Sequence, residues 1–154
     1  MNHDSYSSDY VRNILQSVKT IALVGASSNE VRPSYFVMKY LIDKGYEVIP
    51  VNPGLAGQQI LGQTVYASLG DIPKPVDMVD IFRNSEAAGP ITDEAIAIGA
   101  KIVWMQLGVL NAAAAARAEA AGLRVVQDRC PKIEFSRLFG ELGWHGFNSG
   151  EIIR

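Results

Sequence analysis

Cysteine and histidine are scarce in this sequence, and their scarcity excludes several kinds of site. The chain of 154 residues has one cysteine, Cys130, and two histidines, His3 and His145. A single cysteine cannot form a disulfide within the chain, so we expect a reducing, cytoplasmic compartment. Both histidines lie near the chain ends, which leaves little for a histidine-based metal site or a serine–histidine catalytic triad.

Long apolar runs and an excess of one charge are also absent. The apolar runs are far shorter than the roughly 20 residues of a membrane helix, and the polar N-terminus has no signal-peptide core. With 14 basic and 16 acidic side chains, the net charge is −2, which gives no general attraction to nucleic acid or to anionic membranes. At 48% hydrophobic residues, the chain is expected to fold as one globular domain, residues 1–154.

Short apolar runs alternate with helical patterns along the chain. Residues 54–75 are expected to be an irregular connection with one helical turn at 67–70, and Gly89–Pro90 is expected to break or kink a helix in its first turn. Strands are predicted at residues 20–24, 47–51, 76–82, 102–105 and 123–126. Helices are predicted at residues 8–18, 33–44, 86–98, 112–121 and 132–142.

This alternation predicts an α/β fold. Apolar strands separated by helices form a parallel sheet covered on both faces. Right-handed crossovers then give a doubly wound, Rossmann-like, three-layer domain of five strands in the order 3-2-1-4-5, with extra helices at the N- and C-terminal ends. In such sheets a ligand binds at the carboxyl ends of the strands, beside the first one. That rule selects four segments, residues 25–34, 52–54, 82–84 and 106–108.

The first of these segments lacks the glycines of a dinucleotide site. The NAD fingerprint has glycine at the first, third and sixth loop positions, but after Gly25 the sequence has Ser27 and Glu30 there. Asn52 stands where an acidic residue would bind the ribose, and residues 53–59 contain no basic residue for NADP. NAD and NADP are therefore disfavoured.

The same loop still suits an anion. Ala26, Ser27 and Ser28 are small, the serines add hydroxyl donors, and the next helix directs its positive end to the loop. Arg32 at that helix start could pair with a phosphate in bidentate fashion. The alternative is that the serines only cap the helix and Arg32 is solvated. Arg83 follows the third strand, across the predicted crevice, and two arginines suit a ligand with several phosphates.

Four stretches together resemble a known family. They are VGASSNEVRPSYFVMKYLIDKGYEVIPVNP, ILGQTVYASLGDIPKPVDMVDIFR, GAKIVWMQLGV and GLRVVQDRCPKIEF. In this order they resemble the small stand-alone CoA-binding proteins, which are similar to the N-terminal domain of the succinyl-CoA synthetase alpha subunit. The resemblance spans about residues 10–138. It implies a Rossmann-like fold that holds coenzyme A at the switch point of its sheet.

The resemblance also implies a set of binding residues. A loop contacts the CoA phosphates, polar positions at the helix start face phosphate, a turn after strand two lies near the ribose or adenine, and a segment after strand three flanks the ligand. With Ser28 from the loop, the corresponding residues are Gly25, Ala26, Ser27, Ser28, Arg32, Ser34, Asn52, Pro53, Phe82 and Arg83. CoA carries a 3′-phosphate that a carboxylate would repel, which fits the missing acidic residue.

Two hypotheses follow for the function. The first is a CoA- or acyl-CoA-binding protein without catalysis of its own, which senses CoA or works with a partner enzyme or as a homodimer. The alternative is a small cofactor-dependent enzyme or an NAD(P)-binding oxidoreductase-like domain. The ligase activity of succinyl-CoA synthetase needs a further domain with a phosphorylated histidine, and neither His3 nor His145 lies in a matching motif.

Three side chains remain as candidates outside the loop. Cys130, just after the last strand, could form a mixed disulfide with CoA, or be a small packed residue. Asp77 and Asp80, three positions apart in one strand, point to opposite faces. They are therefore expected to have buried, capping or hydrogen-bonded roles, and not paired catalysis.

Overall fold

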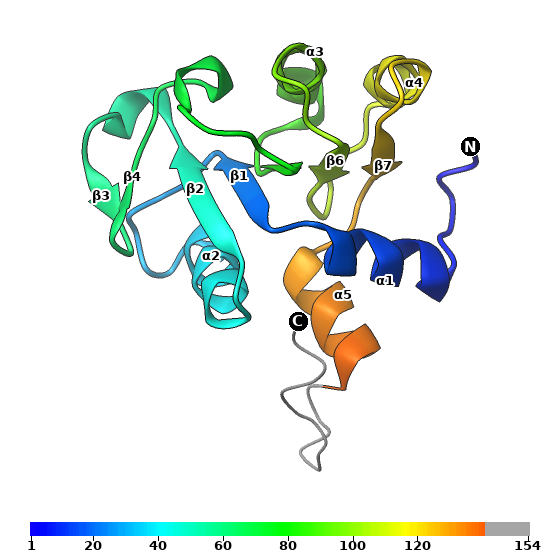
Figure 1. Ribbon diagram of the computed structural model, residues 1–154, viewed down its shortest axis with the longest axis horizontal. Coiled ribbons are helices and arrows are strands. Elements are labelled where there is room, and N and C mark those ends of the chain that lie inside the picture. Colours follow the sequence, from blue (N-terminus) through cyan, green and yellow to red (C-terminus); the bar gives the residue numbers. More distant parts are fainter. Residues whose placement is uncertain (141–154) are drawn as a thin grey trace.

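A parallel sheet of five strands forms the centre of the molecule (Figure 1). The structure is a computed structural model that describes residues 1–140; His145 lies outside the described residues. The sheet has the order β2-β1-β5-β6-β7. These strands are β1 (Thr20–Val24), β2 (Glu47–Val51), β5 (Met78–Ile81), β6 (Ile102–Met105) and β7 (Arg124–Val126). No helix among residues 1–140 is long and apolar enough to cross a membrane.

Both faces of the sheet are apolar, as parallel strands require. Along β1, Ile21 and Leu23 enter one core and Ala22 enters the other, because successive side chains of a strand point to opposite faces. Helices then cover the two faces, so that the molecule has three layers.

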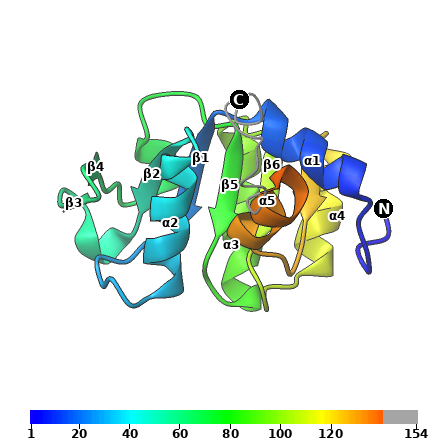
Figure 2. The ribbon, with the colours of Figure 1, turned by 90° about the horizontal axis from the view of Figure 1, so that it is seen from below.

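The helices divide between the faces as Figures 1 and 2 show. Helices α1 (Ser8–Ser17), α2 (Pro33–Asp43) and α5 (Pro131–Phe139) lie on one face, and α3 (Ser85–Ala97) and α4 (Ala112–Ala120) lie on the other. The predicted N- and C-terminal helices are therefore α1 and α5, and they pack on each other. The α/β, Rossmann-like class is confirmed.

The predicted strand order 3-2-1-4-5 is wrong. The third predicted strand, β5, pairs with β1 on the side opposite β2, with Leu23 in register with Asp80. The physical reason lies in the connection after β2. Tyr66 of that connection bridges Val51, and its backbone exchanges hydrogen bonds with Asn52 and Pro50. The outer side of β2 is thus already occupied, and β5 adds beside β1 instead.

The connection between β2 and β5 has more structure than the sequence indicated. It contains the 3₁₀ helix η1 (Pro53–Leu55), the hairpin strands β3 (Gln59–Ile60) and β4 (Gln63–Thr64), and the 3₁₀ helix η2 (Leu69–Asp71). The hairpin lies beyond the β2 edge in Figure 1. The predicted helical turn at residues 67–70 corresponds to η2, which begins two residues later and ends one residue later than predicted.

The expected break at Gly89–Pro90 does not occur. Helix α3 runs through Pro90 without interruption. Proline has no N–H to bond the carbonyl four residues earlier, but Pro90 lies on the exposed side of the helix, where water can hydrate that carbonyl. The predicted last helix, residues 132–142, is α5, and within the described chain it ends at Phe139 before left-handed Gly140.

Candidate functional site

A cleft of about 780 Å³ opens at the carboxyl ends of β1, β2 and β5. Its volume falls in the range of small-molecule sites. Every residue predicted for the site lines it: Gly25, Ala26, Ser27, Ser28, Arg32, Ser34, Asn52, Pro53, Phe82 and Arg83. Their contact with a ligand stays a prediction. The lining also includes Pro33 and Gly54, which lie in the predicted segments but were not among the predicted binding residues, and Val24, Val51 and Leu55 from outside those segments. The turn signal Asn52–Pro53–Gly54 could have indicated Gly54 and Leu55.

The wrong strand order did not displace the predicted site. In both the predicted and the observed orders, the strands that follow β1 are added first on one side of it and then on the other, and the crevice outside the carboxyl ends forms at that switch point. The observed order brings the segment after β5 directly beside the loop after β1. That is why Phe82 and Arg83 line the same cleft as Arg32.

Gly25 fixes the close approach of these two segments. Its φ is +96°, and a Cβ built on it would lie 2.3 Å from the carbonyl oxygen of Phe82 and 3.2 Å from Cδ of Arg83. Its N–H donates to the carbonyl oxygen of Val51 at 3.0 Å. Any other residue would both adopt an unfavourable conformation and collide with the β5 segment. The glycine therefore allows the loop after β1 and the segment after β5 to lie in direct contact at the cleft.

Helix α2 begins at the cleft without a side-chain cap. The residue before it is Arg32, whose side chain makes no capping hydrogen bond, and Pro33 follows as the first helical residue. The Ser27 hydroxyl accepts from the N–H of Asn29 at 3.0 Å within the loop. The alternative that the serines cap α2 is therefore wrong for the described chain. The positive end of the helix dipole stays open to a ligand.

Arg32 and Arg83 are the arginines that lack a protein partner. Neither guanidinium group has a hydrogen bond or ion pair within residues 1–140, and no aspartate or glutamate of that part lines the cleft. Every other described arginine donates to a protein oxygen: Arg12 to Asp9, Arg117 to Asp93, Arg124 to Asn13, Arg129 to Asp128 and Arg137 to Glu134. Two unpaired guanidinium groups give the cleft a positive charge of the kind that suits an anion.

Asn52 holds two walls of the cleft together. Its amide nitrogen donates to the carbonyl oxygen of Ala26 at 2.8 Å, and its amide oxygen accepts from the N–H of Gly54 at 2.8 Å. The side chain thereby connects the loop after β1 to the turn after β2. Because its polar atoms already have protein partners, Asn52 shapes the cleft by holding these two segments together. The sequence did not indicate these hydrogen bonds.

The two aspartates of the third predicted strand have different surroundings. Asp77 accepts hydrogen bonds from the N–H groups of Lys19 and Thr20 at 2.9 and 3.0 Å, which confirms the hydrogen-bonded alternative expected of it. Asp80 is wholly buried in β5, and neither carboxyl oxygen has a hydrogen-bond partner among the described residues. The hydrogen-bonded role expected for Asp80 is therefore wrong, and burial raises its pKa well above the ordinary value.

The remaining candidates lie away from the cleft. Cys130 is buried at the start of α5, and Gln106, the first residue of the predicted segment 106–108, is buried in the turn after β6. Neither Cys130 nor any residue of that segment lines the cleft. Gly108 donates its N–H to Asp128. Among residues 1–140, no group of three histidine, cysteine, aspartate or glutamate side chains is arranged to hold a metal ion.

Comparisons with known proteins point to one family. A family model described as a CoA binding domain matches residues 19–136. The "Uncharacterized protein YneT" of Bacillus subtilis (strain 168) is 37% identical over 123 residues, which cover 80% of this chain and 90% of that protein. The alpha subunit of an ADP-forming acetate–CoA ligase I from Pyrococcus furiosus is 35% identical over 89 residues, 55% of this chain and 19% of that subunit.

Solved structures agree in fold. A hypothetical protein from Pyrococcus horikoshii OT3 superposes with a TM-score of 0.85 and 40% identity, covering 91% of this chain and 97% of that one. A structure from Thermus thermophilus superposes with a TM-score of 0.83 and 37% identity, covering 87% of this chain and 100% of that one.

Proposed function

The chain belongs to the CoA-binding domain family, and from this premise we propose that its cleft binds coenzyme A or an acyl-CoA. The observation that carries the proposal is the pair Arg32 and Arg83. They are the described arginines without a protein partner, and both line a cleft that contains no described carboxylate. A polyphosphate ligand would supply the missing partners.

The geometry suggests how each part of the ligand is held. The pyrophosphate lies against the loop from Gly25 to Ser28, where the backbone amides of Ser27 and Ser28, the serine hydroxyls and the uncapped start of α2 converge; the amides of Gly25 and Ala26 already donate to Val51. Arg32 and Arg83 neutralise charge from opposite sides of the loop. The nucleoside end lies toward Pro53 and Leu55, the apolar part of the lining.

We propose that the protein binds CoA without chemistry of its own. The cleft lining holds no described histidine, cysteine, lysine, aspartate or glutamate, so its serines lack a general base. Cys130 lies outside the lining, which leaves a CoA mixed disulfide without support. Relatives with ligase names are much longer than the matched region, and their activity is not transferred. A carrier or sensor of CoA in the reducing cytoplasm fits these features.

NAD and NADP are the competing ligands, and the position of Asn52 argues against them. A dinucleotide site uses the end of the second strand to bind the ribose. Here that side chain bonds Ala26 and Gly54 instead. The residue offers neither a carboxylate for NAD nor a cation for NADP.

Titration calorimetry with CoA, acetyl-CoA, NAD, NADP and ATP tests the proposal. We expect CoA species to bind and NAD and NADP not to. Arg32→Ala and Arg83→Ala should each weaken CoA binding by about 1.5–3 kcal/mol, the usual contribution of a charge-assisted hydrogen bond. The control is Arg12→Ala, which removes an exposed arginine paired with Asp9 on α1 and should leave the affinity unchanged.

Two results would contradict the proposal. Binding of NAD or NADP with no binding of CoA would replace the proposed ligand. Unchanged CoA affinity in both cleft variants would show that CoA binds elsewhere on the molecule.

A further inference from the structure

The order of the strands determines where each part of the proposed ligand leads. The sheet runs β2-β1-β5-β6 at this end. In the proposed complex the nucleoside lies at the turn after β2 and the pyrophosphate at the loop after β1. The pantetheine arm is attached to the other end of the pyrophosphate, so it leaves on the side of β5. The next strand in that direction is β6, and Ile81 and Met105 are in register where the two strands end.

The turn after β6 exposes two leucines at this edge of the sheet. Leu107 and Leu110 each keep 53% of their surface exposed, whereas Val109 between them is buried. Neither leucine lines the cleft. Together they present apolar surface to water at the strand next to β5, on the side to which the arm leads.

Ser85 connects this turn to the wall of the cleft. Its hydroxyl accepts from the N–H of Leu110 at 2.9 Å and donates to the carbonyl oxygen of Gly108 at 3.4 Å. Ser85 comes two residues after Arg83, which lines the cleft. The segment after β5 therefore contributes to the cleft with its first residues and holds the turn after β6 with Ser85.

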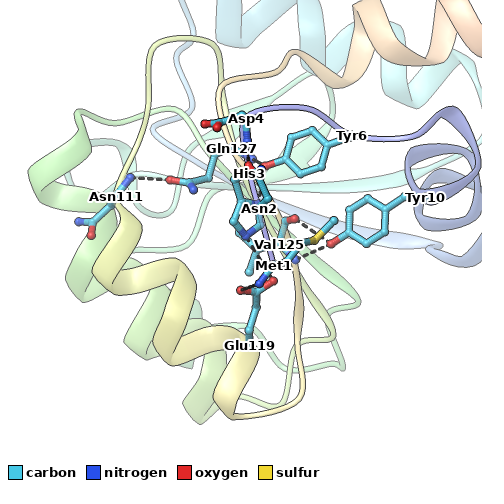
Figure 3. Close-up of polar contacts among 10 residues, drawn as sticks. All are labelled: Met1, Asn2, His3, Asp4, Tyr6, Tyr10, Asn111, Glu119, Val125 and Gln127. Atoms are coloured by element: carbon cyan, nitrogen blue, oxygen red, sulfur yellow. Dashed lines mark hydrogen bonds and ion pairs between the residues drawn. The ribbon is translucent and has the colours of Figure 1, made fainter.

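Residues that follow β7 fix the other side of the turn. The N–H of Gly108 donates to the Asp128 carboxylate at 2.7 Å, and the N–H of Asn111 donates to the side-chain oxygen of Gln127 at 2.7 Å, as Figure 3 shows. Each backbone N–H from residue 108 to residue 111 thus has an acceptor within the protein. The turn is preformed, and a preformed surface costs little ordering entropy when a ligand binds.

The leucine pair, Leu107 and Leu110, suits a narrow chain better than a protein. A stable protein interface buries about 800 Å² on each partner, and two half-exposed leucines supply only a small part of that area. The residues that hold the turn in place, Ser85, Asp128 and Gln127, are polar. The other exposed large apolar side chains of the described residues lie on other segments: Met1, Val31, Phe36 and Ile133.

We propose that the leucine pair holds the acyl chain of an acyl-CoA whose nucleotide occupies the cleft, so that the ligand is an apolar acyl-CoA and not free CoA. This rests on the proposed function, because it requires the CoA moiety in the cleft. From the loop after β1 to the turn after β6 is two strand spacings, about 10 Å. An extended pantetheine arm exceeds that length, so its thioester end reaches Leu107 and Leu110.

Titration calorimetry of the full-length protein with CoA, acetyl-CoA and octanoyl-CoA tests the acyl site. The wild type should bind octanoyl-CoA about tenfold more tightly than CoA, because burial of about two methylene groups accounts for such a factor. Acetyl-CoA has a single methyl group and should bind about as CoA does. In Leu107→Ser/Leu110→Ser the preference for octanoyl-CoA should disappear.

Ile133→Ser is the matched control. Ile133 is 51% exposed, nearly as much as each leucine, and it lies on α5, on the other face of the sheet from α3 and α4. This variant should keep the tenfold preference. Loss of the preference in this variant as well would show that the octanoyl chain binds apolar surface without selection, which overturns the acyl site.

Leucine methyl NMR of the wild type gives a second measurement that needs no variant. Leu55 lines the cleft, so CoA and octanoyl-CoA should shift its methyl signals equally. Only octanoyl-CoA should shift those of Leu107 and Leu110. If the double variant also loses affinity for CoA, this measurement decides.

The outcomes separate the acyl site from the proposed function. No binding of any of the three ligands would overturn both. Equal affinities for CoA and octanoyl-CoA, with Leu55 shifted by each, would overturn the acyl site and leave CoA binding in place. A preference that survives in Leu107→Ser/Leu110→Ser would place the acyl chain elsewhere. Signals of Leu107 and Leu110 that shift with protein concentration, and not with octanoyl-CoA, would show that a second copy covers them instead.

Discussion

At the scale of single residues, Gly25 limits what the cleft can tolerate. Gly25→Ala should reduce the free energy of unfolding by about 2–4 kcal/mol, because backbone strain adds to a collision with Phe82. Gly45→Ala is the matched control. It has a similar φ of +100° but nothing within 4 Å of a built Cβ, so about 1–2 kcal/mol is expected from strain alone. Urea unfolding measures the loss of stability in both variants. Equal losses would show that the close approach of Phe82 to Gly25 adds nothing to the effect of backbone strain.

Asp80 gives a prediction on pH. Burial raises its pKa in the folded protein, so between the unfolded value of about 4 and the raised value the folded state binds the extra proton. The contribution of this carboxyl to the free energy of unfolding is fully present below about pH 4. As pH rises toward the raised pKa, that free energy falls by up to about 1.4 kcal/mol per pH unit.

The variant Asp80→Asn isolates this effect, because all other titrating groups are shared. The stability difference between the variant and the wild type should shift in favour of the variant as pH rises from about 4 to 8. Urea unfolding across that range measures it. A difference that does not change with pH would mean that Asp80 ionises normally in the folded protein.

At the scale of elements, the cleft depends on the link between the loop after β1 and the turn after β2. Asn52→Ala removes the bonds to Ala26 and Gly54, and Asn52→Asp places a carboxylate against the Ala26 carbonyl. Each should cost about 1–3 kcal/mol of stability. Only Asn52→Asp adds a negative charge to the cleft, so it should weaken CoA binding more. Calorimetry decides, and equal affinities of the two variants would show that no phosphate lies near this position.

At the scale of the whole molecule, the cleft is opposite in charge to the protein. The chain has a net charge of −2, whereas the cleft lining has two arginines and no described carboxylate. CoA at about 100 times its Kd should increase the free energy of unfolding by about 2.7 kcal/mol. This increase should raise Tm by roughly 5–11 °C for a chain of this size.

Added salt provides a check on the origin of that stabilisation. It should shrink the shift in Tm by screening the arginine–phosphate attraction. Thermal unfolding with CoA and with NAD, at low and high salt, measures both effects. An equal shift with NAD would show that the cleft does not select CoA.

Local patterns predicted most of the elements, because their causes lie within a few residues. Apolar runs are sufficient to locate buried strands, and α4 begins at the predicted residue, Ala112, where Asn111 caps it. The continuous α3 shows the limit of a local rule. Whether Pro90 breaks a helix depends on which side of the helix faces solvent, and that is decided by packing. The hairpin β3–β4 was missed because its strands are only two residues long.

The sequence by itself determined the α/β class and the positions of the five sheet strands and of the helices, because periodicity acts locally. Small loop residues and the positions of Arg32 and Arg83 pointed to the switch point, and the resemblance to CoA-binding proteins added Ser34, Pro53 and Phe82. Only the tertiary structure decided the strand order, since it depends on Tyr66 occupying the outer side of β2. It also decided which polar groups stay free. Arg32 and Arg83 lack partners while Asn52 has two, and that follows from distances between segments that the order of residues does not contain.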